Sequence, residues 1–101
     1  MTIKRAILKV DGSVIPFEKS MSIFAVYRTL GAKSVDSISL HHMGYPLHVM
    51  MIDDQGHLKG LPVNAQATAL YHLNCKPDTT HEIRGDAIIV PDSDFSEVPH
   101  D

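Results

Sequence analysis

The strongest constraint on this chain is the grouping of its apolar residues into short runs that turn residues interrupt. Asp11-Gly12 separates an apolar, β-branched run at 3–10 from another at 13–17, and this pattern predicts a β-hairpin. Pro16 places the second strand at a sheet edge or ends it there, because proline cannot donate a ladder hydrogen bond. No apolar run approaches the roughly 20 residues of a membrane-spanning helix. We therefore expect a small sheet with short connections and no membrane partner.

Two segments have the apolar spacing of a helix. In the first, four apolar residues follow one another at i, i+3, i+4 and i+7, namely Ile23, Val26, Tyr27 and Leu30. Ser20 or Ser22 can cap the start of this helix, and Gly31 follows its last turn. A second helix is predicted over 65–73, with Asn64 as its N-cap.

Three further runs have the composition of strands. They cover 34–40, 46–52 and 81–90. The sequence Asp-Asp-Gln-Gly at 53–56 predicts a turn that leads into an optional short strand at His57-Leu58. We therefore predict an α+β domain over 1–91, in which a mostly antiparallel sheet carries two helices packed on one face. Its predicted order is ββα-ββ(β)α-β.

Charge is distributed unevenly along the chain. The formal net charge is −3, and four of the twelve acids lie in a final segment that contains no Lys or Arg. These acids are Asp92, Asp94, Glu97 and Asp101. We expect 92–101 to be an acidic, flexible tail. The nine bases are scattered along the chain rather than clustered, so duplex nucleic acid is not an expected partner.

Cysteine content and the first residues indicate a compartment. A single cysteine, Cys75, excludes an internal disulfide framework. The start Met-Thr-Ile-Lys-Arg lacks the apolar run of a signal peptide. A reducing cytoplasm is therefore the expected location.

An adaptable apolar stretch surrounds the fourth predicted strand. Methionine fills irregular gaps in a core, but it also suits surfaces that must accept several shapes. Adjacent residues of a strand point to opposite faces, so one of Met50 and Met51 can lie outside the core. Core packing is the first interpretation of this stretch. The alternative is a surface, extended by the tail, for a host protein or for a homodimer. Its candidate residues are Met43, Tyr45, Met51, Asp92, Asp94 and Glu97.

The sequence Gly-Leu-Pro-Val-Asn at 60–64 predicts a corner that delivers the chain into the second helix. Pro62 fixes its own φ and Asn64 can cap the next turn, so the corner can serve only to set the angle between strand and helix. The free amides of the same helix start can also bind an anion, with a lysine beside them to neutralise a phosphate. The candidate ligand-binding residues for a small nucleotide are Lys59, Gly60, Asn64, Gln66 and Arg84.

Seven histidines invite a metal interpretation, since zinc takes four nitrogen or sulfur ligands, or three and a water. His72, Cys75 and His81 form a weak candidate set without a convincing fourth ligand, so we predict no metal and no other cofactor. Cys75 with one of these histidines is also a weak candidate nucleophile. A lone cysteine at a helix end is more often a small packing residue, so no catalytic residue is predicted.

Three motifs carry a resemblance to a known family. They are Asp-Asp at 53–54, Gly-His-Leu-Lys-Gly-Leu-Pro-Val-Asn at 56–64 and Gly-Asp-Ala-Ile-Ile-Val at 85–90. In these motifs and their placement, the chain resembles the domain of unknown function 3846 family over roughly 3–91. The family occurs in bacteriophages, plasmids and their hosts, so the resemblance implies a mobile-element origin. It supplies no established catalytic residues.

These observations predict a non-enzymatic binding protein, borne by a phage or another mobile element. It would act in the cytoplasm of a bacterial host by occupying a host factor or defence component. The alternative is an oligomeric protein that sequesters a small molecule or nucleotide at the helix start after Leu61-Pro62.

Overall fold

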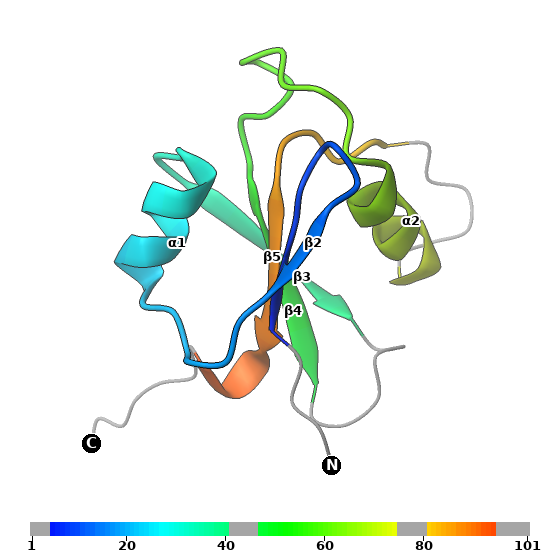
Figure 1. The fold of residues 1–101 in the computed structure, drawn as a ribbon. Helices are drawn as coiled ribbons and strands as arrows, with labels where there is room; N and C mark the ends of the chain where they lie inside the picture. The colour runs from blue at the N-terminus through cyan, green and yellow to red at the C-terminus, as the bar shows by residue number, and fades with distance from the viewer. Residues whose placement is uncertain (1–4, 41–46, 75–80, 95–101) are drawn as a thin grey trace.

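Five antiparallel strands form one sheet in the order β2-β1-β5-β4-β3 (Figure 1). The computed structural model describes residues 5–40, 47–74 and 81–94. The strands are β1 Ala6–Leu8, β2 Val14–Pro16, β3 Val35–Leu40, β4 His48–Asp53 and β5 Ala87–Pro91. The helices are α1 Ile23–Leu30, α2 Ala65–Asn74 and the short 3-10 helix η2 Asp92–Asp94. The predicted α+β class and the alternation of strand pairs with helices are confirmed.

The last strand along the chain, β5, occupies the middle of the sheet between β1 and β4. All five of its residues are buried, as its unbroken apolar sequence predicts. The optional strand at His57-Leu58 is not formed, because residues 54–60 make consecutive turns. In place of a strand, the described residues before β5 form an isolated bridge between Val63 and Arg84.

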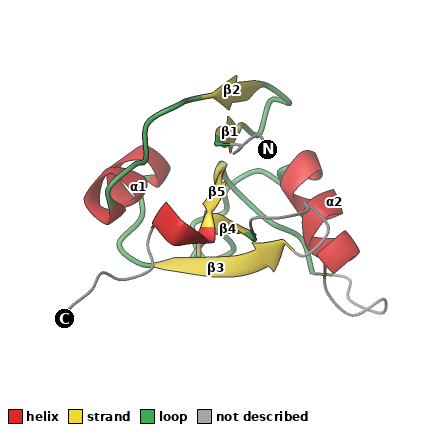
Figure 2. Cartoon of the chain, turned by 90° about the horizontal axis from the view of Figure 1, so that it is seen from below, coloured by secondary structure: helices red, strands yellow, loops and turns green. Residues whose placement is uncertain are grey.

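The two helices cover opposite faces of the sheet, which corrects the expectation that both lie on one face (Figure 2). Ala67 of α2 belongs to a buried cluster with Met50 of β4, whereas Val26 of α1 belongs to a cluster with Met51. Because neighbouring strand residues point to opposite faces, these two clusters lie on the two sides of the sheet. β4 and β5 are apolar at successive positions, and that pattern is typical of strands buried on both faces.

Burial on both faces also decides the place of the methionines. Met50 is fully buried and Met51 is 6% exposed. The prediction that Met51 contributes to a partner surface is therefore wrong, because α1 covers the face to which it points. Met43 and Tyr45, which were predicted to share that surface, lie outside the described residues.

The ends of α1 follow the expected capping chemistry. Of the two candidate caps it is Ser22 that accepts a hydrogen bond, from the amide of Ala25 to its Oγ at 3.1 Å. Gly31 ends the helix with φ of 65°, a conformation that costs other residues energy. Two capping residues thus set the length of α1. No helix in the described part of the chain is long and apolar enough to cross a membrane.

The segment that follows β5 begins as an ordered part of the domain. Asp94 of η2 accepts two hydrogen bonds from Arg5, from Nε at 2.7 Å and from Nη2 at 2.8 Å. These bonds raise the pKa of Arg5, and the side chain of Asp94 is only 6% exposed. The prediction of Asp94 as a partner-surface residue is therefore wrong, because its carboxylate faces the domain. Asp92 is exposed, and Glu97 lies outside the described residues.

Candidate functional site

Asn64 joins three elements at the corner before α2. Its Nδ2 donates to the carbonyls of Leu8 at 2.9 Å and Gly85 at 3.0 Å, and its Oδ1 accepts from the amide of Ala67 at 3.1 Å. The side chain is fully buried, and both amide hydrogens are used. The predicted N-cap is confirmed, and the same residue also fastens α2 to β1 and to the turn before β5.

Lys59 and Gln66 likewise bond to distant parts of the chain. The Nζ of Lys59 donates to Asp53 Oδ2 at 2.6 Å and to the carbonyl of Gly31 at 3.0 Å. Its charge is therefore already paired with Asp53, beside the end of α1. Gln66 Nε2 donates to the carbonyl of Gly12 at 2.6 Å and thereby ties α2 to the β1–β2 turn. Gly60, the first residue of the 60–64 corner, has φ of 66°. These contacts set backbone positions.

Of the five predicted ligand residues, Arg84 alone lines a cleft that lies beside Ile52 and Ile83. Its Nη1 donates to the carbonyl of Leu61 at 3.0 Å, and its Nη2 lies 3.6 Å from Glu82 Oε1. Its Nε is buried and bonds to no residue in the described part of the chain. The structure therefore does not gather the five predicted residues around one space.

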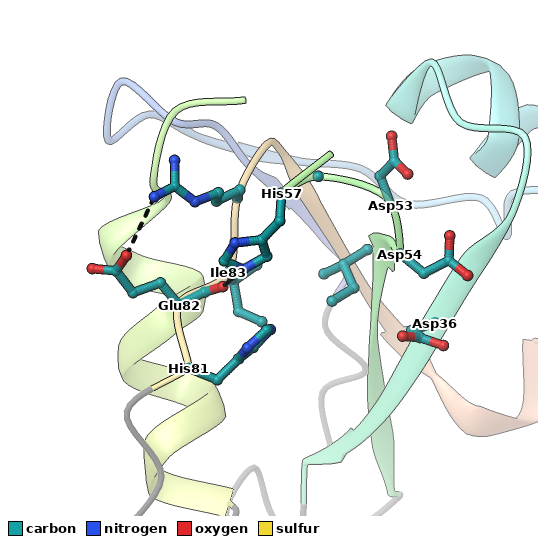
Figure 3. A pocket seen from close by; sticks show the side chains of 10 residues that line it. Asp36, Asp53, Asp54, His57, His81, Glu82 and Ile83 are labelled. Atoms are coloured by element: carbon teal, nitrogen blue, oxygen red, sulfur yellow. Dashed lines mark hydrogen bonds and ion pairs between the residues drawn. The ribbon is translucent and has the colours of Figure 1, made fainter. Parts of the chain in front are cut away.

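A cleft of about 140 Å³ opens on the α2 side of the sheet, beside the end of β4. Its floor is apolar, since Ile52 of β4 and Ile83 are both buried. Asp36 of β3 and Asp54 lie beside one another on one wall, and His57, His81 and Glu82 lie on the opposite wall (Figure 3). The cleft thus joins a hydrophobic base to a polar rim.

The rim of the cleft is acidic. Asp36, Asp53, Asp54 and Glu82 line it, against the single guanidinium of Arg84. Asp53 is buried and already paired with Lys59. Asp54 is exposed and accepts a hydrogen bond from Ser34 Oγ at 2.6 Å. Asp36 is also exposed, and no described residue bonds to its carboxylate. Asp36 and Asp54 therefore give one wall a negative charge that faces solvent.

The histidines near the cleft bond to the backbone. His57 Nε2 donates to the carbonyl of Glu82 at 3.1 Å, and His72 Nε2 donates to the carbonyl of His81 at 2.7 Å. The rings of His57 and His81 lie 4.8 Å apart. In the weak metal set, His72 and His81 are thus joined by a bond from a ring to a backbone carbonyl. The third member, Cys75, lies outside the described residues. Within 5–40, 47–74 and 81–94, no group of three His, Cys, Asp or Glu residues is placed to hold a metal ion.

No motif in the sequence singles out Asp36 or the cleft. The available signal is the spacing of Asp36, which alternates with Ile38 and Leu40 in the run 34–40. Residues two apart in a strand lie on the same face, so this acid shares a face with apolar residues. The approach of residues 81–84 to the end of β4 leaves no comparable pattern, because it depends on the fold.

In comparisons with known proteins, no protein-family model, no curated protein and no solved structure matches this chain. The resemblance to the domain of unknown function 3846 family stays a prediction.

Proposed function

We propose that this chain is a non-enzymatic binding protein, carried by a phage or another mobile element, that occupies a protein of its bacterial host in the cytoplasm. The observation that carries the proposal is the size of the cleft. At about 140 Å³ it is smaller than the roughly 300–1,000 Å³ of sites that enclose a small-molecule ligand. A space of this size suits one side chain of a protein partner.

The use of the polar groups at the corner supports the same proposal. A nucleotide site at the start of α2 requires free donors, but Asn64 is buried and fully occupied, and Lys59 is bound to Asp53. Releasing either residue would break contacts that hold α2 or α1 in place. The geometry therefore favours a scaffold that presents its surface over one that captures a nucleotide at this corner.

Exposed apolar side chains provide further contact area. Phe24 is 74% exposed on the outer side of α1, and Arg28 follows one turn later, also exposed. Aromatic and arginine side chains are enriched where protein partners bind. The host setting and the role against a defence component rest on the family resemblance alone.

Native mass spectrometry of the protein, purified from producing cells without added ligand, tests the proposal. We expect a species with the mass of the bare chain and a second species in which the chain is bound to a host protein. We also expect this complex to form again when the two purified proteins are mixed. The denatured mass of the same sample is the control. A mass excess of nucleotide size, lost on denaturation, would favour the sequestering alternative and contradict the proposal.

A further inference from the structure

The hydrogen bonds of β4 alternate between its two neighbouring strands. The amide of Asp92 donates to the carbonyl of Leu47 at 2.8 Å, so odd-numbered residues of β4 bond toward β5. The amide of Asp54 donates to the carbonyl of Ser34 at 3.4 Å, so even-numbered residues bond toward β3. The two hydrogen bonds therefore agree that odd-numbered and even-numbered residues of β4 bond to different neighbouring strands.

The outer edge of β3 follows from this alternation. Even-numbered β3 residues face β4 through pairs such as Asp36 with Ile52. The backbone N–H and C=O groups of Val35, Ser37 and Ser39 therefore point away from the sheet. β3 is the last strand on its side, and no described residue pairs with this edge (Figure 2). Its six residues contain no proline and keep an uninterrupted register with β4.

Such an edge is a template for one more strand, because every second residue offers a donor and an acceptor. A strand added here lies with its alternate side chains on the α2 face, as Asp36 does. Residues directly opposite in paired strands have Cβ atoms roughly 5 Å apart. A long side chain opposite Asp36 can therefore reach the wall formed by Asp36 and Asp54.

The residues that line the cleft indicate which kind of side chain fits it. The stems of lysine and arginine pack on apolar surface while their charged ends stay with polar groups. The buried Ile52 and Ile83 supply the apolar floor, and Asp36 and Asp54 supply exposed carboxylates at the rim. Charge-assisted hydrogen bonds to carboxylates are stronger than neutral ones. This combination selects a basic residue over an acidic or a purely apolar one.

We infer that β3 receives an extended basic segment of the partner protein as a sixth strand, with a lysine or arginine directed to the Asp36–Asp54 wall of the cleft. The inference rests on the proposed function and specifies the chemistry of the partner. A second copy of the chain is a poorer occupant, because its own β3 carries the same carboxylate and no base.

The probe is a short fluorescent peptide in which lysine alternates with threonine and valine, read by fluorescence anisotropy. A matched peptide carries glutamate in place of every lysine. We expect saturable binding of the lysine peptide and a Kd at least about tenfold weaker for the glutamate peptide, because like charges at a contact are repelled. Equal binding of the two peptides, or no binding of the lysine peptide, overturns the inference.

Two variants of the chain locate the binding. Ser37→Pro removes an outward amide and leaves the bonds between β3 and β4 in place, whereas Asp36→Lys reverses the charge of the wall. Each is expected to weaken binding of the lysine peptide about tenfold or more. Asp36→Lys retains the strand backbone, so it tests the inference even where Ser37→Pro disturbs folding.

Matched controls repeat the same changes elsewhere. Val14→Pro removes an outward amide from β2 at the other sheet edge, and Glu18→Lys makes the same charge change at another exposed position. Neither is expected to change the Kd beyond about twofold. Equal losses in the control and test variants overturn the inference, as does a dimer of the chain that Ser37→Pro dissociates.

Failure of the inference is distinguishable from failure of the proposed function. A purified host partner that binds Ser37→Pro and Asp36→Lys as tightly as the wild type overturns the β3 site and leaves the binding function standing. A chain that acquires no protein partner, and instead retains a nucleotide, contradicts the function itself.

Discussion

The corner at Asn64 and the outer edge of β3 both present polar groups, but they direct them oppositely. At the corner, the donors of Asn64 bond to Leu8 and Gly85 within the domain, and the side chain is fully buried. Along β3, the odd-numbered backbone groups and the Asp36 carboxylate face outward. Buried polar groups stabilise a fold only when they are paired, whereas outward groups remain available to a partner. Groups that stabilise the fold and groups that stay open to a partner thus lie in different regions.

The other sheet edge sharpens this distinction. β2 has only three residues, and Pro16 has no amide hydrogen to offer a further strand. Its outward groups are therefore fewer than those of β3. One edge is blunted by proline, and the other stays open along six residues.

The largest expected effect is at the corner. Asn64→Ala removes the cap and the two buried bonds to the carbonyls of Leu8 and Gly85, so we expect a loss of about 2–4 kcal/mol in the free energy of unfolding. Urea denaturation measures it. Ser22→Ala, which removes only the exposed cap of α1, is the matched control with an expected loss of about 1 kcal/mol. Equal losses would show that Asn64 acts only as a cap.

A smaller effect is expected where the two ends of the described chain meet. Asp94→Asn weakens two charge-assisted bonds to Arg5 in a largely buried pair, and we expect a loss of about 1–2 kcal/mol. Thermal unfolding measures the change. Asp92→Asn, an exposed acid of the same short helix, is the control. No difference between the two variants would mean that η2 is not held by its ion pair.

The β3 variant is expected to change stability least among the substitutions that alter binding. Asp36→Lys replaces an exposed side chain at a sheet edge, so the free energy of unfolding should shift by no more than about 0.5 kcal/mol. The same urea titration measures it. A loss as large as that of Asn64→Ala would remove the contrast between a structural corner and a binding edge.

The smallest effect is an acid dependence in the β1–β2 turn. Hydrogen bonds from the hydroxyl and then the amide of Ser13 lower the pKa of Asp11 below its ordinary 3.8. The folded pKa lies below the unfolded one, so this contribution is present above about pH 4 and is lost as the pH falls through the folded value. Asp11→Asn should therefore lower Tm slightly at neutral pH, and the difference from wild type should vanish at pH values below the folded pKa of Asp11. A difference that persists there would contradict this assignment.

Local sequence signals were sufficient for the elements and their ends. The caps at Ser22 and Asn64, the break at Gly31 and the hairpin at Asp11-Gly12 depend on residues close together in the chain, so they could be predicted. To assign each helix to a face of the sheet, both faces of β4 and β5 must be considered, since each face needs an element to cover it. Their unbroken apolar runs signalled burial on both faces, but the prediction placed both helices on one.

The five predicted ligand residues do not surround one space, and the reason is a different one. Asn64 bonds to Leu8 across 56 residues, and Gln66 bonds to Gly12 across 54. No local pattern reveals that a polar side chain already has a partner so far away. The cleft has the same origin, since it forms only when 81–84 approaches the end of β4.

The central position of β5 also governs how the chain can be built. β1 and β4 both pair with a strand that leaves the ribosome after them, and at roughly 5–20 residues per second β1 waits on the order of 4–16 s for it. Until β5 emerges, the nascent chain carries the strands of two hairpins, β1–β2 and β3–β4, without the strand that joins them. Such non-local pairing slows folding, because the loop must close before its contacts form. Assembly of the sheet is therefore a late event, and the growing chain depends on β5 to bring its two halves together.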